Sequence, residues 1–381
     1  MKNEQHQDWN PLEASVLKDQ RQAYDDMRER CPVAHSDLMG WSLFRHADIV
    51  DVLADPESYS NVSQFLAIPN GMDAPDHGRY REALDPNFNA TEMARIEPMA
   101  REIAAALLEP IGSCGVMEFI DTFATPFTLK TLCASLGWPE QQWECLSSWV
   151  HDSQQAAFDQ DSVAGKALAS FFSGQVKANL DKRRAAPNAA RDATTALLGT
   201  KIGGVRLNDD QIVSVLRNWT AGQGTTAAAL GILVLHLAQD SGLQDQLRGD
   251  LSLIPAAIEE ILRADGPLVA NPRTTTREVQ IQGRCIPKGE RVTLMWMAAN
   301  RDSRAFDAPE AVKIERDTRD SLVWGQGVHL CQGAPLARLE MRVAIEELLS
   351  RAKHFALDHN DIPRRAVYPG NGLITLPLRF S

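Results

Sequence analysis

The segment "SLVWGQGVHLCQGAPLARLE" (Ser321–Glu340) places one cysteine between glycine-rich turns and a predicted helix. Glycines at 325, 327 and 333 let the backbone bend and approach another group closely, as residues with a β-carbon could not. From Ala334 the pattern predicts a helix with Pro335 in its first turn and one apolar face, formed by Ala337, Met341, Ala344 and Leu348. Cys331 then precedes a helix N-terminus, where the helix dipole favours a thiolate. We expect a metal ligand or a nucleophile here; a buried structural cysteine is the alternative.

The composition is that of a globular protein: of 381 residues, 44% are hydrophobic and 23% are charged. A formal net charge of −11 disfavours a general nucleic-acid partner. No apolar run reaches the roughly 18 to 20 residues that a membrane span requires, so we expect a cytoplasmic protein. The six cysteines are scattered and form no C-x-x-C pair, so neither a disulfide scaffold nor a zinc site is expected.

Most of the chain has helical periodicity, which is longest in residues 90–112, 209–240 and 254–267. Strand signals are short: residues 40–46, residues 277–296, which predict a hairpin turning around 287–289, and one strand in 372–380. No repeat or linker divides the chain. We therefore predict one domain, residues 1–381, that is mainly α with a small β region.

Several motifs together resemble one family, the cytochromes P-450. "WGQGVHLCQG" is similar to the family's haem-binding loop, F-x-x-G-x-H/R-x-C-x-G, and "APLARLE" is a common bacterial continuation. The resemblance covers nearly the whole chain, and its other motifs follow in the family's order: "GWSLFRHADIVDVLADPESYSN", "MDAPDHGRYREAL", "AGQGTT", "EILR", "NPR" and "AANRDSRAFDAPEAVKIERD".

The resemblance implies haem b, lying between an oxygen-activating helix and the helix after Cys331. Cys331 would be its axial thiolate ligand, in a loop that Gly333 completes. Buried propionates need partners, and the family motifs assign this role to His77, Arg81, Arg273 and His329, with a hydrogen bond from Asn271. Glu260 and Arg263 share a helix face, and the resemblance adds Arg316 to a structural network with them.

The segment "AGQGTT" (Ala221–Thr226) departs from the family, which has an acidic residue where this chain has Gly224. The resemblance implies that Gly222 and Thr225 shape the dioxygen groove. Glycine cannot deliver protons, so we expect ordered water held by Thr225 and Thr226 to do so. The alternative is that Gly224 serves a close helix crossing.

Trp324 is a second departure, since the family usually has phenylalanine beside the thiolate. Simple aromatic packing is one interpretation. The other is an indole N–H donated to the sulfur, which would raise the iron potential.

The sequence says least about the identity of the substrate. Ala221 and Asn218 share the helix face of Thr225, with Arg217 to one side. A polar group there would suit an oxygenated or anionic substrate, although these residues could equally pair with other helices. The other candidate pocket walls are Val269, Ala270, Phe65 and Leu66.

The resemblance thus implies a monooxygenase that inserts one atom of O2 into a small, largely apolar organic substrate. Because the chain carries no flavin or iron–sulfur segment, we expect a ferredoxin or flavodoxin with its NAD(P)H-dependent reductase as partner, and a monomer without a membrane span. A peroxide-driven peroxygenase is the alternative that Gly224 raises. A haem sensor or carrier is the non-enzyme alternative.

Overall fold

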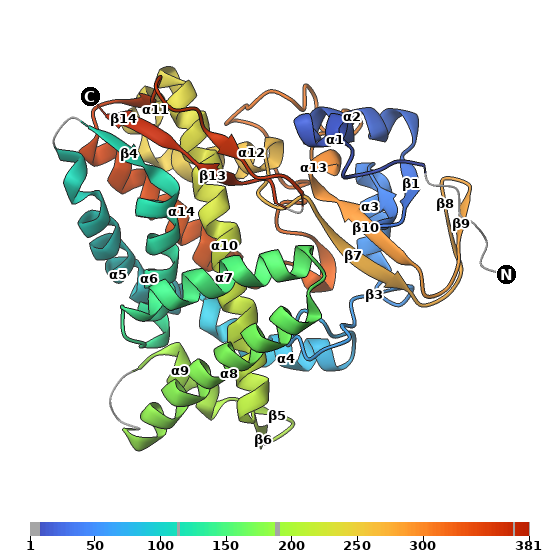
Figure 1. The fold of residues 1–381 in the computed structure, drawn as a ribbon, viewed down its shortest axis with the longest axis horizontal. Helices are drawn as coiled ribbons and strands as arrows, with labels where there is room; N and C mark the ends of the chain where they lie inside the picture. Colours follow the sequence, from blue (N-terminus) through green and yellow to red (C-terminus); the bar gives the residue numbers. More distant parts are fainter. Residues whose placement is uncertain (1–7, 113–114, 187–190, 369, 381) are drawn as a thin grey trace. The chain divides into compact units, whose positions relative to one another are not determined.

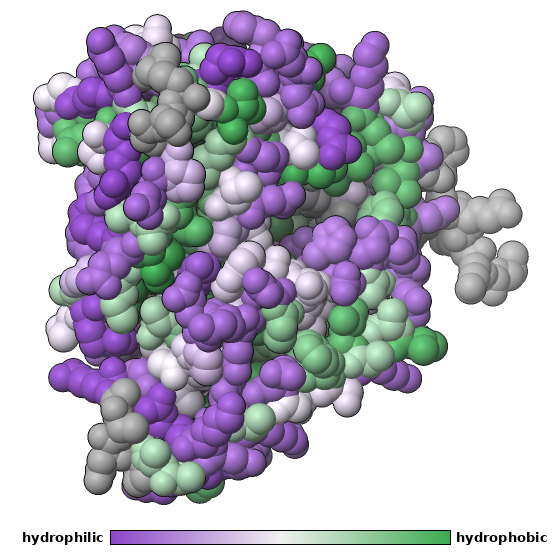
Figure 2. Space-filling view, turned by 60° about the vertical axis from the view of Figure 1, so that its left-hand side comes forward, coloured by the Kyte–Doolittle hydropathy of each residue, from purple (hydrophilic) through white to green (hydrophobic). Residues whose placement is uncertain are grey.

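The computed structural model describes residues 8–112, 115–186, 191–368 and 370–380. The chain forms two compact units from interleaved segments (Figure 1). Unit 1 comprises Met1–Val62, Ala256–Cys331 and Arg365–Gly372, and unit 2 comprises Ser63–Pro255, Gln332–Arg364 and Leu373–Ser381. Hydrophilic side chains cover most of the face seen in Figure 2 and leave smaller apolar areas between them.

A five-stranded sheet organises unit 1. Its order is β1 (Val33–Ser36), β2 (Gly40–Leu43), β10 (Arg291–Met295), β7 (Ala270–Thr275) and β3 (Tyr59–Ser60). The strand expected in residues 40–46 is therefore present. β10 pairs parallel with β2 and antiparallel with β7, so N-terminal and later segments lie side by side (Figure 1). Gly40 has φ 63°, and a β-carbon there would lie 2.4 Å from the Arg291 carbonyl oxygen, so this close approach requires glycine.

The helices of unit 1 are short. They are α1 (Ala14–Lys18), α2 (Gln20–Arg30), α3 (His46–Ala54), most of α12 (Ile254–Ala264) and α13 (Trp296–Ala299), with the 3-10 turn η5 (Gly327–His329). α13 packs on α2 and α3. One apolar cluster includes Leu43, Ile49 and Leu294, and a second gathers Tyr24 and Phe44.

The hairpin predicted around residues 287–289 is wrong in its turn and its partner. The strands β8 (Val279–Ile281) and β9 (Arg284–Ile286) pair instead across Gln282 and Gly283, which have φ 49° and 77°. Two consecutive left-handed residues match the twist of a two-residue hairpin. Residues 287–290 then carry the chain to β10, which pairs with β2 and β7.

Unit 2 is mainly helical. Its helices are α4 (Asp76–Leu84), α5 (Ala90–Leu108), α6 (Thr125–Leu136), α7 (Gln142–Phe158), α8 (Ser162–Ala185), α9 (Ala193–Gly199), α10 (Asp209–Gln239), α11 (Ser241–Gly249) and α14 (Ala334–Arg351). Shorter turns are η1 (Asp85–Phe88), η2 (Glu109–Gly112), the π-helical η3 (Ile120–Ala124) and η4 (Leu251–Leu253). These helices confirm the helical periodicity of residues 90–112 and 209–240.

α10 is the central helix of unit 2. It begins with a capping box, in which Asn208 and Gln211 exchange hydrogen bonds of 2.9 Å. It packs on α6, α7, α8 and α14. The helix is long and apolar enough to cross a bilayer, but 67% of its most apolar window is buried inside the protein, as in the core helix of a globular protein.

The strands of unit 2 are short. They are β4 (Val116–Glu118), β5 (Lys201–Ile202), β6 (Val205–Arg206), β11 (Phe355–Leu357), β13 (Leu373–Thr375) and β14 (Pro377–Phe380). In the sequence, unit 2 gives way to unit 1 within β12 (Arg364–Arg365). The single strand expected in residues 372–380 is in fact two. It breaks at Leu376, whose N–H donates to the Glu118 carboxylate at 2.6 Å and whose carbonyl accepts from the Phe119 N–H at 2.9 Å.

A buried ion cluster links parts of the Ala256–Cys331 segment of unit 1. Glu260 and Arg263 are fully buried on α12 and make two hydrogen bonds, of 2.7 and 2.9 Å. Arg316 donates to the same carboxylate at 2.8 Å, as does the Lys313 amide at 3.0 Å. Burial opposes the ionisation of Glu260, but these donors outweigh it, so the pKa of Glu260 lies below its usual value. The predicted three-residue network is therefore present.

Replacing Glu260 by alanine should lower the free energy of unfolding by about 3–5 kcal/mol, because it leaves buried guanidinium groups without their counter-charge. Since the pKa of Glu260 is depressed, its contribution is present above the usual carboxyl range and is lost as pH falls through the folded-state value. Urea unfolding measures both effects. Glu315→Ala, which removes an exposed carboxylate, is the control. A loss for Glu260→Ala no larger than the control's would contradict the structural role.

Candidate haem-ligand loop and oxygen-activating helix

The loop that carries Cys331 is shaped by its glycines. Gly325 and Gly327 have φ 69° and 71°, and a β-carbon at Gly327 would lie 2.9 Å from the Leu53 carbonyl oxygen. The Cys331 amide donates to the Trp324 carbonyl at 2.9 Å, and the cysteine itself is exposed. α14 begins three residues later, as predicted. Gly333 has an ordinary φ of −81° and open surroundings, so backbone conformation does not explain that glycine.

Trp324 does not direct its indole N–H at the sulfur. Its Nε1 donates to the Glu259 carboxylate at 2.8 Å. An indole has a single donor, so the interpretation in which this N–H tunes the thiolate is wrong for this structure. The hydrogen bond instead anchors the loop to α12.

The other predicted residues of unit 1 lie on or beside β7, with His329 in η5. Arg273 is buried, and its Nη1 donates to the Pro272 carbonyl at 2.8 Å. The Asn271 side chain accepts from Trp296 Nε1 at 2.9 Å. Val269 is fully buried in an apolar core cluster, while Ala270 is partly exposed at the edge of that cluster.

In unit 2, His77 and Arg81 lie on α4. His77 is buried, and burial together with the positive charge of Arg81 lowers the pKa of its imidazole, so the ring is neutral near neutral pH. Arg81 pairs with Asp85 at 2.9 Å. The amide of Gln332, the residue after Cys331, donates to the same Asp85 at 2.7 Å and accepts from Trp219 Nε1 at 3.3 Å. No spacing rule pointed to this chain of contacts.

α10 presents two chemically different faces across the motif. Gly222 and Thr225 are exposed together with Ala221, whereas Gln223 and Thr226 are buried. The Thr226 hydroxyl donates to the Gly222 carbonyl at 3.4 Å, within the helix. The structure thus separates the two threonines that the sequence placed together. A β-carbon at Gly222 would meet no described atom within 4 Å.

Gly224 lies where α7 approaches α10. A β-carbon there would lie 3.0 Å from Val150 Cγ1 and 3.2 Å from Gln154 Nε2. Such contacts are tighter than most real ones, and Val150 is itself buried. The close-crossing interpretation of Gly224 therefore accounts for the missing acid, since an aspartate would push Val150 aside.

Among the described residues, the side chains of Arg217 and Asn218 donate their hydrogen bonds to the 63–71 loop and not to another helix. Asn218 Nδ2 donates to the Ile68 carbonyl at 2.7 Å. Arg217 Nη2 donates to the Leu66 carbonyl, and the guanidinium lies 5.7 Å from the centre of the Phe65 ring. Phe65 and Leu66 are 69% and 49% exposed, so the loop offers apolar surface beside this cation.

Glu340 is a buried carboxyl that the sequence reasoning missed. It lies on α14 with no exposed surface. With the Gln223 amide oriented to donate, its nitrogen lies 3.2 and 3.3 Å from the two carboxyl oxygens and 3.3 Å from the Thr128 carbonyl oxygen. Burial raises the pKa of Glu340 well above its usual value. The apolar periodicity of α14 predicted the helix, but nothing in the sequence around Glu340, the residue before Met341, indicated that this acid is buried.

Glu340→Gln should flatten the pH dependence of stability. Because the folded-state pKa of Glu340 is raised, the contribution of this residue to the stability of the parent is largest below the usual carboxyl range. This contribution then falls by up to about 1.4 kcal/mol per pH unit as pH rises toward the folded value. Glutamine has no proton to lose. Urea unfolding at about pH 5 and about pH 7 tests this. Glu102→Gln, at an exposed position, should keep the parent's slope, and an equally steep slope in Glu340→Gln would refute the assignment.

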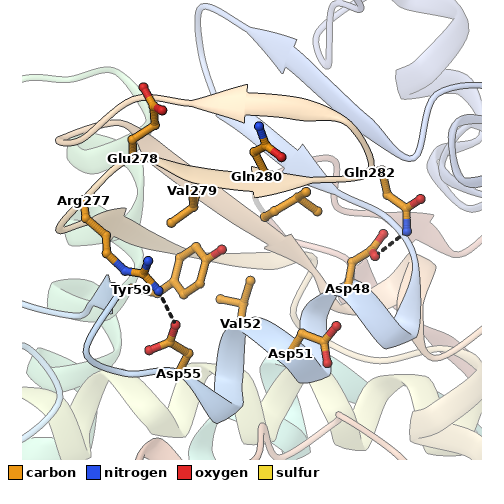
Figure 3. Close-up of a pocket in the computed structure, with 11 residues that line it drawn as sticks. Asp48, Asp51, Val52, Asp55, Tyr59, Arg277, Glu278, Val279, Gln280 and Gln282 are labelled. Carbon is orange, nitrogen blue, oxygen red and sulfur yellow. Dashed lines mark hydrogen bonds and ion pairs between the residues drawn. The ribbon is translucent and has the colours of Figure 1, made fainter.

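A polar surface groove of about 440 Å³ lies elsewhere in unit 1, between α3 and the β8–β9 hairpin (Figure 3). Arg277 pairs there with Asp55 at 3.4 Å, and Gln282 donates to Asp48 at 2.7 Å. None of the predicted site residues lines this groove. It is therefore separate from the candidate site.

Comparison with known proteins matches this arrangement to one family. The family model "Cytochrome P450" matches residues 141–380. Cyclomarin C epoxidase CymV of Salinispora arenicola is 31% identical, over 86% of this chain and 87% of that protein. Vitamin D(3) 25-hydroxylase of Pseudonocardia autotrophica is 32% identical, over 88% and 87%. The open cytochrome P-450 EryK from S. erythraea is 28% identical with a TM-score of 0.86, over 95% of each chain.

These relatives are a hydroxylase and an epoxidase that span nearly the same length as this chain, and the solved structure shares its fold. The mainly α fold, the glycine-constrained cysteine loop and the full-length similarity agree with one another. The chain therefore belongs to the cytochrome P-450 family and is a haem-thiolate monooxygenase.

Proposed function

We propose that Cys331 is the thiolate that ligates the haem iron of this enzyme. Its loop carries the proposal: two left-handed glycines and an anchored tryptophan hold an exposed cysteine directly before a helix. The other described cysteines fit the role poorly. Burial raises the pKa of Cys133 to about 12, and it also raises the pKa values of Cys31 and Cys145. Cys285 is exposed, and partial desolvation together with the neighbouring Glu278 carboxylate raises the pKa of its thiol. When bound, the haem-thiolate group supplies the activation of O2 for insertion of one oxygen atom.

Cys331→Ala should abolish the thiolate-type absorption of the reduced, carbon-monoxide-bound protein, together with substrate oxidation. Cys133→Ala removes a thiol of similar size from the core and should keep that absorption. The two spectra are compared at equal haem content. A normal thiolate absorption in Cys331→Ala would overturn the assignment.

His77, Arg81, Arg273 and His329 are proposed to hold the haem propionates, with Asn271 adding a hydrogen bond. Two observations support this set. His77 and Arg273 are polar groups buried in the protein, and a neutral imidazole retains an N–H to donate. Burying a carboxylate is costly unless it is paired and hydrogen-bonded, and guanidinium groups are the strongest partners for it.

Thr225 is proposed to manage proton delivery in place of the missing acid. Its hydroxyl lies on the exposed face of α10 beside Gly222, where Oγ1 can hold an ordered water. A β-carbon at position 224 would crowd Val150 and Gln154, which disfavours an acidic side chain there. Thr226 is buried on the other face, so the hydroxyl of Thr225 is the better placed of the two.

Thr225→Ala should lower the product formed per NADH consumed, because electrons are then lost to peroxide when protons are misdirected. Thr225→Ser keeps the hydroxyl and should keep the coupling. Product, NADH and peroxide are measured together with competent redox partners. Equal coupling in the parent and Thr225→Ala would remove the proton role. Product from peroxide alone, with none from redox partners, would instead support the peroxygenase alternative that Gly224 raises.

Electrons are proposed to come from a ferredoxin or flavodoxin with its NAD(P)H-dependent reductase, and the enzyme is proposed to work as a cytoplasmic monomer. Val328 and Leu330, beside Cys331, are about half exposed and form an apolar surface on which a redox protein can dock.

The substrate is proposed to be a small, largely apolar organic molecule. The proposed pocket residues are Phe65, Leu66, Arg217, Asn218, Ala221, Val269 and Ala270.

A further inference from the structure

We propose that Arg217 binds a carboxylate on the substrate, so that the enzyme oxidises apolar carboxylic acids at a carbon remote from the acid group. This inference rests on the proposed function, in which Thr225 marks the reacting end of α10. It adds the chemical class of the substrate.

The guanidinium of Arg217 lacks a counter-charge. Within the part of the chain that the structure describes, no carboxylate pairs with it, and only its Nη2 donates a hydrogen bond, to the Leu66 carbonyl. Burial lowers the pKa of Arg217, with no acidic neighbour to oppose the effect. Most other partly buried arginines of unit 2, such as Arg101 and Arg342, lie in ion pairs. A half-buried arginine with free donors favours a bidentate carboxylate ligand.

Arg217 is not needed as a clamp for the loop. Ser214 donates to the Leu66 carbonyl at 3.0 Å and accepts from the Ile68 N–H at 2.8 Å. Asn218 donates to the Ile68 carbonyl at 2.7 Å. These three hydrogen bonds fasten the same segment to α10, so the charge of Arg217 has no evident structural purpose.

The surroundings of Arg217 fit an amphipathic acid. The exposed Phe65 ring and Leu66 lie beside the cation and offer apolar surface to a substrate body. Arg217 precedes Thr225 by eight residues on α10, which places them about 12 Å apart along the helix axis. A carboxylate at Arg217 therefore leaves the oxidised carbon well away from the acid group.

The test compares acids with their uncharged methyl esters. Decanoic, lauric and myristic acids and the three esters are titrated into the haem-loaded parent and Arg217→Gln by calorimetry, and haem spectral shifts are recorded. For at least one chain length, the parent should bind the acid more tightly than the ester. Arg217→Gln should weaken acid binding by about tenfold to a hundredfold and change ester binding by less than about twofold.

Arg217→Lys keeps the charge and should retain part of the preference, while Arg206→Ala, which removes an exposed arginine that precedes α10, should leave it unchanged. The proposal is overturned if no acid is preferred over its ester, or if Arg217→Gln weakens acid and ester equally. The proposed function is tested separately. If it is wrong, the reduced, carbon-monoxide-bound parent lacks the thiolate-type absorption, whereas the calorimetric comparison of acids with esters does not depend on that absorption.

Discussion

The buried carboxylate of Glu260 is the charge around which the haem-ligand loop is arranged. Arg263 neutralises it and also donates to the Asn300 carbonyl at 2.7 Å. The Asn300 side chain in turn accepts the N–H of Leu322 at 2.7 Å, at the start of the loop that carries Cys331. Because a buried charge is tolerable only when its partners are all in place, this cluster constrains the chain that leads to the cysteine.

In unit 2, a short stretch of α10 carries both the exposed Thr225 and residues that pack against other helices. Its exposed face carries Thr225, while its opposite face places Gln223 against the buried Glu340. Gly224 lies between these two faces and admits α7. A side chain at this position would press on Val150, so the close approach of α7 disfavours an acid at position 224. In the proposed function, the hydroxyl of Thr225 therefore takes on proton delivery without help from an acid at position 224.

Some elements could be predicted, and others could not, for identifiable reasons. The Glu260–Arg263 pair follows from helical spacing, and α10 from its periodicity and cap. The turn of the β8–β9 hairpin was misplaced because both candidate turns contain glycine, and the true one uses Gln282 at a positive φ that non-glycine residues seldom adopt. Strand pairing is also non-local: β10 joins β2, which lies about 250 residues earlier, and no short window reports it.

The sequence by itself predicted the cysteine loop, the long α10 helix and the family resemblance. It could do so because glycine dihedral freedom, helix caps and apolar periodicity are local properties. The tertiary structure alone decided what Gly224, Trp324, Arg217 and Glu340 contact. Each of these contacts depends on a segment tens to hundreds of residues away: α7 against Gly224, Glu259 at the Trp324 indole, the 63–71 loop at Arg217 and Gln223 beside Glu340. A side chain's charge, donor or size is written in the sequence, but whether it is buried, paired or left free is set by the neighbours that folding brings to it.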